Sequence, residues 1–181
     1  MKTPNILTVL RVFMIPLFIG AFLVPGISDW ITLAIFLIAA ITDALDGHIA
    51  RKKNIVTDFG KLMDPLADKI MVMSAFVCFT AAGILHPLIT ITILAREFLI
   101  TGLRSVASSK GKVIAADIWG KAKTLSEYIF VVVTLAKREG AFGFEEFFGI
   151  VATVALVVAI ALAIISAIHY CIKNKEFFKD N

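Results

Sequence analysis

The chain has 181 residues, of which 59% are hydrophobic and 18% are charged, with a mean hydropathy of +0.91 and a formal net charge of +4. This composition excludes an ordinary soluble domain and indicates an integral membrane protein, and the length suits one domain over residues 1–181. We expect no nucleic-acid partner. The two cysteines, Cys78 and Cys171, lie in separate apolar segments without metal-binding spacing, so we expect reduced thiols.

Six apolar segments approach the length of about 20 residues that a helix needs to cross a bilayer. In chain order they are residues 4–24, 30–49, 64–82, 87–106, 119–136 and 147–172. The first contains Arg11 and is not followed by a small-residue cleavage site, so we expect it to stay in the protein. The sequence therefore predicts an all-α polytopic membrane protein, a bundle of six transmembrane helices.

The sixth segment carries a stripe of small residues. Ala155, Ala159, Ala163 and Ala167 recur at every fourth position. Such a stripe lets two helix backbones approach closely. We expect this face to pack within the bundle, and a dimer interface is the alternative.

Basic residues are distributed unevenly between the two sides that six spans would create. The connections after the second and fourth segments, the heads of the segments that follow them, and the C-terminal tail hold Arg51, Lys52, Lys53, Lys61, Lys110, Lys112, Lys121, Lys123, Lys173, Lys175 and Lys179. The other side holds Lys137 and Arg138. The positive-inside rule therefore places both termini on the cytoplasmic side.

Four aspartates stand near the predicted cytoplasmic boundary of this apolar chain. Asp43 and Asp46 are three residues apart, and Asp64 and Asp68 are four apart, so each pair shares one face of a helix. Carboxylates gathered from two antiparallel helices would repel one another unless cations compensate them. Oxygen ligands favour Mg²⁺ or Mn²⁺. We predict a divalent-metal site, and solvated residues paired with nearby basic side chains are the alternative.

The residues beside the aspartates point to a phosphate ligand. Gly47 and Gly60 allow a ligand or a neighbouring helix to approach the backbone closely. Arg51 can bind a phosphate through two parallel hydrogen bonds. Together with the carboxylates these residues favour a diphosphate site. A divalent-cation transporter is the alternative from another class, although transporter sites gather near the middle of the membrane.

The spacing of these residues resembles a known signature. The pattern Asp43-x-x-Asp46-Gly47-x-x-Ala50-Arg51, then eight residues, then Gly60-x-x-x-Asp64-x-x-x-Asp68 matches every fixed position of the CDP-alcohol phosphotransferase signature. The resemblance implies an integral membrane enzyme, usually a homodimer. Such enzymes transfer a substituted phosphate from a CDP-alcohol to a second alcohol and release CMP.

The resemblance also implies roles for single residues. It makes Asp43, Asp46, Asp64 and Asp68 the ligands of divalent ions, two of Mg²⁺ or Mn²⁺, and Asp68 the general base as well. It assigns contacts with the CDP-alcohol to Gly47, Arg51, Thr57 and Gly60.

Three further stretches are similar to bacterial phosphatidylglycerophosphate synthases. They are PNILTVLRV at the N-terminus, AREFLITGLRSVA in the fourth segment and WGKAKT in the fifth. The first supplies Asn5, Thr8 and Arg11 on successive turns, as further candidates for binding CDP-diacylglycerol at its cytidine and phosphate end. The similarity implies a bacterial cell-membrane enzyme, with glycerol 3-phosphate as the acceptor; inositol phosphate, serine or phosphatidylglycerol are the alternatives.

A basic cluster near the predicted site suits an acceptor that carries a phosphate. The candidates to bind that phosphate are Lys61, Arg96, Arg104, Lys121 and Lys123. Charged residues inside a membrane are costly and are therefore often functional. The alternatives are an ion pair of Arg96 or Arg104 with Glu97, and lysines near the interface that extend their ammonium groups into water.

Overall fold

The computed structural model describes the backbone of residues 3–53, 58–109, 118–140 and 143–173. Side chains are described for residues 10–42, 69–107, 118–140 and 143–173. The described chain forms the helices α1 (Thr3–Leu23), α2 (Asp29–Lys53), α3 (Asp58–Ala81), α4 (Pro87–Ser109), α5 (Ile118–Arg138) and α6 (Glu145–Lys173). No strand occurs within these ranges, which confirms the all-α prediction.

The helices extend beyond several of the predicted apolar segments. The largest differences are at the end of α2, which continues to Lys53, and at the start of α3, which begins at Asp58. Apolar length marks the part that a bilayer would cover, whereas helix-forming residues continue past that boundary: Ala50 to Lys53 at the end of α2, and Lys61, Leu62 and Met63 near the start of α3. At the other end of α3, Gly83 adopts φ 72° and follows the last turn. The N–H groups of Gly83 and Ile84 donate to the carbonyls of Thr80 and Phe79, at 3.0 and 2.9 Å, which is a Schellman termination.

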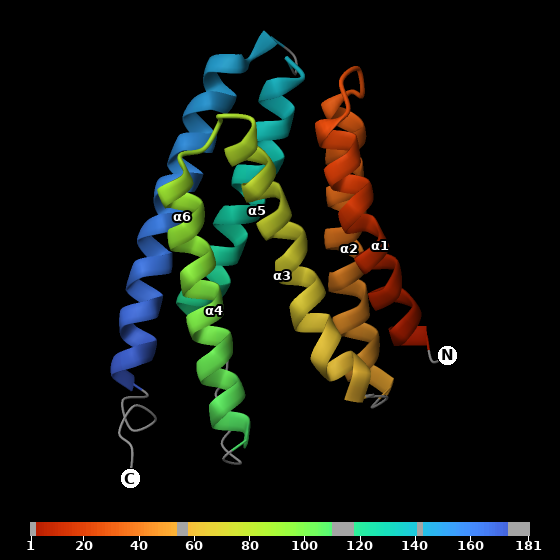
Figure 1. Ribbon diagram of the computed structural model, residues 1–181, viewed down its shortest axis with the longest axis vertical. Coiled ribbons are helices and arrows are strands. Elements are labelled where there is room, and N and C mark those ends of the chain that lie inside the picture. The colour runs from red at the N-terminus through yellow and green to blue at the C-terminus, as the bar shows by residue number, and fades with distance from the viewer. Residues whose placement is uncertain (1–2, 54–57, 110–117, 141–142, 174–181) are drawn as a thin grey trace.

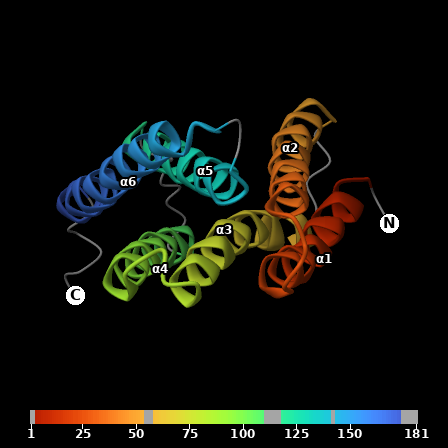
Figure 2. The same cartoon turned by 90° about the horizontal axis from the view of Figure 1, so that it is seen from above.

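The six helices run roughly along one direction and form two layers (Figures 1 and 2). In the view from above, α1, α3 and α4 make one layer, and α2, α5 and α6 make the other. Thr3 and Lys173, where the described helices begin and end, lie at the same, lower end in Figure 1. Toward that end the backbone of α4 diverges from those of α1, α2 and the start of α3.

Aromatic side chains fill the core between the two layers. The ring of Phe18 on α1 lies 6.0 Å from that of Phe36 on α2. The Phe79 ring on α3 lies 5.6 Å from Phe22 and 5.7 Å from Phe130 on α5. Such pairs contribute about 0.5–1.5 kcal/mol each beyond their buried area. These contacts join α1, α2, α3 and α5 in the upper half of the bundle.

The small-residue stripe of α6 packs inside the bundle. Ala155, Ala159 and Ala163 are buried, and Ser166 rather than Ala167 continues the buried row. Because α5 lies alongside α6, small side chains on this face allow the close approach that was predicted. The expectation of packing within the bundle is confirmed, and both Cys78 and Cys171 are free thiols.

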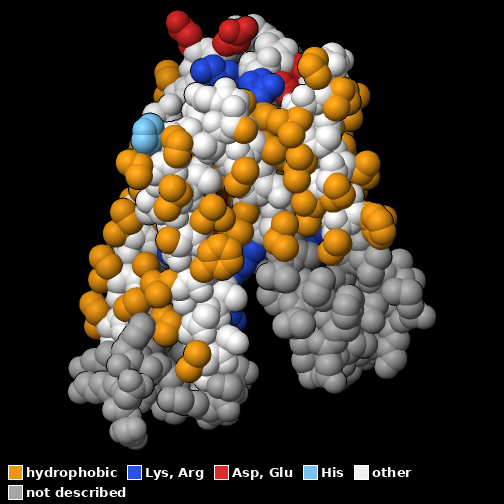
Figure 3. Space-filling model, in the orientation of Figure 1, with side chains coloured by type: hydrophobic (Ala, Val, Ile, Leu, Met, Phe, Trp, Pro, Cys, Tyr) orange, Lys and Arg blue, Asp and Glu red, His pale blue; other side chains and the backbone are white. Residues whose placement is uncertain are grey.

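The outer surface is rich in exposed apolar side chains (Figure 3). Every helix contributes large ones, among them Phe13, Ile38, Val77, Phe98, Leu125 and Ile150. Within the described residues, α6 is the one helix long and apolar enough by composition to cross a membrane. The apolar parts with described side chains in the first three helices are shorter: Leu10–Leu23, Asp29–Thr42 and Lys69–Ala81. So broad an apolar surface is typical of contact with lipid.

Polar contacts at the upper end connect the start of α2 to the end of α5. The carboxylate of Glu139 accepts hydrogen bonds from Ser28 Oγ at 2.7 Å and from the Asp29 N–H at 2.6 Å. Arg138 Nε donates to Asp29 Oδ2 at 2.9 Å, and its guanidinium lies 4.3 Å from the centre of the Phe22 ring. We call Ser28, Asp29, Arg138 and Glu139 the upper latch. Glu139 satisfies an N–H at the N-terminus of α2, as a capping side chain does.

Replacing Glu139 by alanine removes two acceptor contacts of the upper latch. We expect Glu139→Ala to lower the free energy of unfolding by about 1–2 kcal/mol, the usual effect of losing a cap. Thermal unfolding of purified protein in detergent measures this, with the exposed Glu146→Ala as the matched control. Equal melting temperatures for the two variants would contradict the role given to Glu139.

Candidate functional site

The helices bring both segments of the predicted metal site to the lower end of the bundle. Asp43 and Asp46 belong to the second half of α2, and Asp64 and Asp68 to the first half of α3. The two helices run in opposite directions and contact each other. The observed helical backbone gives each pair the spacing of one helix face. The side chains of residues 43–68 lie outside the described part, so the gathering of the four carboxylates stays a prediction.

The predicted contacts for the CDP-alcohol lie in the same region of the chain. Asn5 and Thr8 are in the first turns of α1, and Arg11, one turn further on, is 1% exposed. Gly47 and Arg51 are in the last turns of α2, and Gly60 and Lys61 in the first turn of α3. Thr57 is outside the described residues, as are the side chains of all these positions except Arg11.

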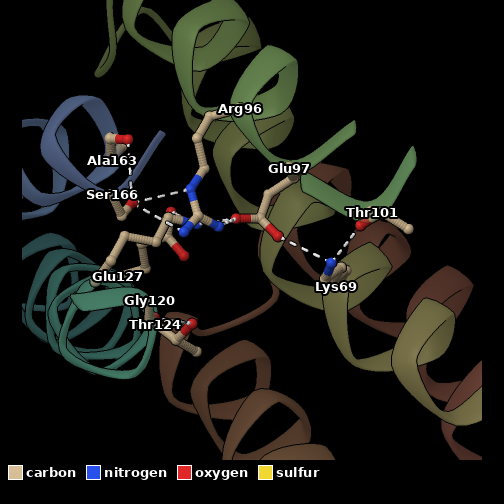
Figure 4. Close-up of polar contacts among 10 residues, drawn as sticks. Lys69, Arg96, Glu97, Thr101, Gly120, Thr124, Glu127, Ala163 and Ser166 are labelled. Atoms are coloured by element: carbon tan, nitrogen blue, oxygen red, sulfur yellow. Dashed lines mark hydrogen bonds and ion pairs between the residues drawn. The ribbon is translucent and has the colours of Figure 1, made fainter. Parts of the chain in front are cut away.

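Glu97 on α4 is the centre of the polar contacts that the structure describes (Figure 4). It is 7% exposed. Its Oε1 accepts hydrogen bonds from Arg96 Nη1 and from Lys123 Nζ, the latter at 2.8 Å. Its Oε2 lies 3.2 Å from Lys69 Nζ. One buried carboxylate therefore holds three basic side chains, which come from α3, α4 and α5.

Further contacts extend this group to α6. Lys123 also forms an ion pair with Glu127, one turn along α5. Arg96 donates to Ser166 Oγ from Nε at 3.2 Å and from Nη2 at 2.9 Å. The guanidinium packs against Gly120, where a Cβ would lie 3.4 Å from Arg96 Nη2, at ordinary van der Waals distance. We call Lys69, Arg96, Glu97, Lys123, Glu127 and Ser166 the Glu97 cluster.

The Glu97 cluster carries a formal surplus of positive charge beside a small cavity. Three basic side chains face two carboxylates, which leaves one positive charge. The cavity has a volume of about 50 Å³ and lies between α3, α4 and α5. Apolar side chains form the rest of its wall, and its polar lining is Lys69, Thr90, Glu97, Lys123, Thr124 and Glu127. A positive surplus in apolar surroundings favours an anionic ligand.

The structure separates the predicted phosphate-binding residues into two groups. Arg96 and Lys123 meet in the Glu97 cluster, and the expected alternative of an Arg96–Glu97 ion pair is present. Arg104 and Lys121 are exposed and lie nearer the lower end. The alternative that Lys123 extends into water at the interface is wrong, because Lys123 is 1% exposed and paired with two carboxylates.

Three residues of the cluster were missed by the sequence analysis. Glu127 had a readable signal, because it is an acid in an apolar run, four residues after Lys123. Lys69 directly follows Asp68, but only the packing of α3 against α4 shows that it meets Glu97. Ser166 had no signal in the sequence, since its role depends on where α6 crosses Arg96.

Comparisons with known proteins cover nearly the whole chain. Residues 1–168 match the family described as CDP-alcohol phosphatidyltransferase. A Bacillus subtilis protein named CDP-diacylglycerol–glycerol-3-phosphate 3-phosphatidyltransferase is 37% identical over an alignment of 191 positions, which spans 97% of this chain and 96% of that protein. A Haemophilus influenzae protein of the same name is 36% identical, with coverage of 98% and 96%. A Mycobacterium tuberculosis protein named probable phosphatidylglycerophosphate synthase is 34% identical, with coverage of 92% and 78%.

Replacing Lys123, the side chain that pairs with both Glu97 and Glu127, tests the ion pairs of the cluster. We expect Lys123→Met to lower the free energy of unfolding by about 3–5 kcal/mol, because it leaves two buried carboxylates short of a partner. Adding Glu127→Gln to this variant should restore part of the loss, since one of those charges is then gone. Thermal unfolding of the single and double variants measures this. A double variant less stable than Lys123→Met would show that Glu127 has no charge coupling to Lys123.

Proposed function

The chain belongs to the CDP-alcohol phosphatidyltransferase family, and we propose that it transfers the phosphatidyl group of CDP-diacylglycerol to sn-glycerol 3-phosphate. The products are phosphatidylglycerophosphate and CMP. The observation that carries this assignment is the nearly full-length match to relatives named for that reaction. The positive surplus of the Glu97 cluster supports an acceptor that bears a phosphate.

We propose that residues 1–181 are one membrane domain, a homodimer in the bacterial cell membrane, with six spans and both termini and the active site on the cytoplasmic side. Three observations support this placement: the first concerns the orientation, the second the contact with the membrane, and the third the bacterial source. The lower end holds Thr3, Lys173 and the signature segments of α2 and α3, whereas Lys137 and Arg138 lie at the other end. Apolar side chains are exposed on all six helices between these ends. The matched relatives named above are bacterial proteins.

The donor set fits two divalent cations, Mg²⁺ or Mn²⁺. Asp43, Asp46, Asp64 and Asp68 offer carboxylate oxygens from two antiparallel helices in contact, and hard cations prefer such ligands. When bound, the ions neutralise the diphosphate and stabilise the departing CMP. The family signature is intact around these residues, which supports the assignment.

The chain's own residues supply binding and proton transfer. Gly47 and Gly60 leave room for the diphosphate, and Asn5, Thr8, Arg51 and Thr57 hold CDP-diacylglycerol. Asp68 takes the proton from a hydroxyl of glycerol 3-phosphate, and the freed oxygen attacks the phosphorus of the phosphatidyl group. The bond from that phosphorus to CMP breaks, and CMP leaves with the bonding electrons.

We propose that Lys61, Arg104 and Lys121 meet the acceptor's phosphate at the entrance, and that Arg96 and Lys123 complete the inner wall. Arg104 and Lys121 are exposed, so their side chains can reach a ligand that arrives from the lower end. A guanidinium has five N–H donors and an ammonium has three. Arg96 and Lys123 therefore keep donors beyond those that their contacts with Glu97, Glu127 and Ser166 require.

A product assay tests the reaction directly. Purified protein receives CDP-diacylglycerol with glycerol 3-phosphate, inositol phosphate, serine or phosphatidylglycerol in turn, and mass spectrometry identifies the lipid formed. We expect phosphatidylglycerophosphate and an equal amount of CMP with glycerol 3-phosphate. A different alcohol as the productive acceptor would overturn the assignment within the family.

Metal removal tests the carboxylate site. We expect EDTA to abolish turnover and Mg²⁺ or Mn²⁺ to restore it, because the four carboxylates and the diphosphate repel one another without cations. Asp43→Asn and Asp64→Asn should each lower the rate by orders of magnitude, and unchanged thermal unfolding controls for the fold. Full activity in either variant would remove that residue from the ligand set.

A further inference from the structure

Lys69 connects the signature segment of α3 to the Glu97 cluster. It directly follows Asp68, and its ammonium contacts two side chains of α4: Oε2 of Glu97 at 3.2 Å and the Thr101 hydroxyl, to which it donates a hydrogen bond (Figure 4). The side chain of Lys69 is 26% exposed, against 11% for Arg96 and 2% for Lys123. Among the three cations of the cluster, Lys69 is therefore the most accessible to a ligand.

The contacts of Lys69 hold its charge in place without cancelling it. Glu97 is shared by three basic side chains, so one negative charge is divided among three positive ones. Its contact with Lys69 is longer than its contact with Lys123, at 3.2 Å against 2.8 Å. Thr101 is a neutral partner, which fixes the direction of the ammonium and leaves its charge unchanged. An ammonium has three donors, and a phosphate oxygen can take the third.

Lys69 follows Asp68 on α3, and its ammonium lies against α4. Successive positions of a helix face directions about 100° apart, so positions 68 and 69 belong to neighbouring faces of α3. Lys69 also lines the cavity between α3, α4 and α5. An acceptor that extends from Asp68 toward this cavity brings its phosphate to the ammonium of Lys69.

We propose that Lys69 is an acceptor-specificity residue that binds the phosphate of glycerol 3-phosphate, and that Glu97 and Thr101 are positioning residues for its ammonium. The inference rests on the proposed function and deepens it. An anionic acceptor compensates the surplus charge of the cluster, whereas an uncharged alcohol leaves it uncompensated. Lys69 thus selects the acceptor from the α3 side of the cavity.

The first experiment separates the two substrates kinetically. We expect Lys69→Met to raise KM for glycerol 3-phosphate about tenfold or more, the usual effect of losing a charge-assisted hydrogen bond, and to leave KM for CDP-diacylglycerol unchanged. Lys69→Arg should retain most of the affinity, because it keeps a positive charge. Thr101→Val should raise the same KM by less than Lys69→Met does. Lys137→Met, at the far end of α5, is the matched control and should behave as the parent protein.

The second experiment removes the phosphate from the substrate. Glycerol has the same hydroxyls without the phosphate, so the loss caused by Lys69→Met should appear with glycerol 3-phosphate and disappear with glycerol. Equal losses with both acceptors, or an unchanged KM for glycerol 3-phosphate, would overturn the inference. Where Lys69→Met unfolds at a lower temperature, Thr101→Val decides by the same comparison of acceptors. A parent protein that forms no phosphatidylglycerophosphate refutes the proposed function, whereas an active parent with an insensitive Lys69 refutes this inference alone.

Discussion

The packing of the helices in the middle of the bundle depends on the ion pairs that the buried carboxylate of Glu97 forms. A charged side chain is costly in apolar surroundings, so each of the three cations there needs an anionic partner. Lys69, Arg96 and Lys123 find that partner in the same residue, although they come from three helices. The ion pairs of Glu97 therefore hold α3, α4 and α5 together, and the same side chains form the polar wall of the cavity beside them.

The aromatic core lies in one half of the bundle and the signature segments lie in the other. The aromatic core and the upper latch join the first helices to α5, and both lie on the side away from the signature segments. Below the Glu97 cluster α4 diverges from α2 and the start of α3 (Figure 1). A site at this end can admit a water-soluble acceptor, while the apolar exterior of the helices can hold a lipid donor in the same membrane.

The sequence predicts the helices well because apolar runs and turn glycines are local signals. The predicted end of α2 is too early and the predicted start of α3 is too late, since residues such as Arg51 and Lys61 continue a helix beyond its apolar part. The signature is likewise local, and so it is readable without a structure. The partners of Lys123 are different, because Glu97 lies on another helix and only packing brings the two together. The contact of Arg96 with Ser166 could not be predicted either, because Ser166 lies on α6 and only packing brings it to Arg96.

The charges of the cluster also explain why a carboxylate belongs in the site that we propose for an anionic substrate. Three cations alone in apolar surroundings would repel one another. Glu97 keeps the three side chains together, and Glu127 adds a second negative charge, yet one positive charge remains in formal terms. The phosphate of the acceptor can supply the missing negative charge. In the proposed site the phosphate of the acceptor then balances the one formal positive charge that remains among the described side chains of the cluster, and a neutral alcohol leaves it unbalanced.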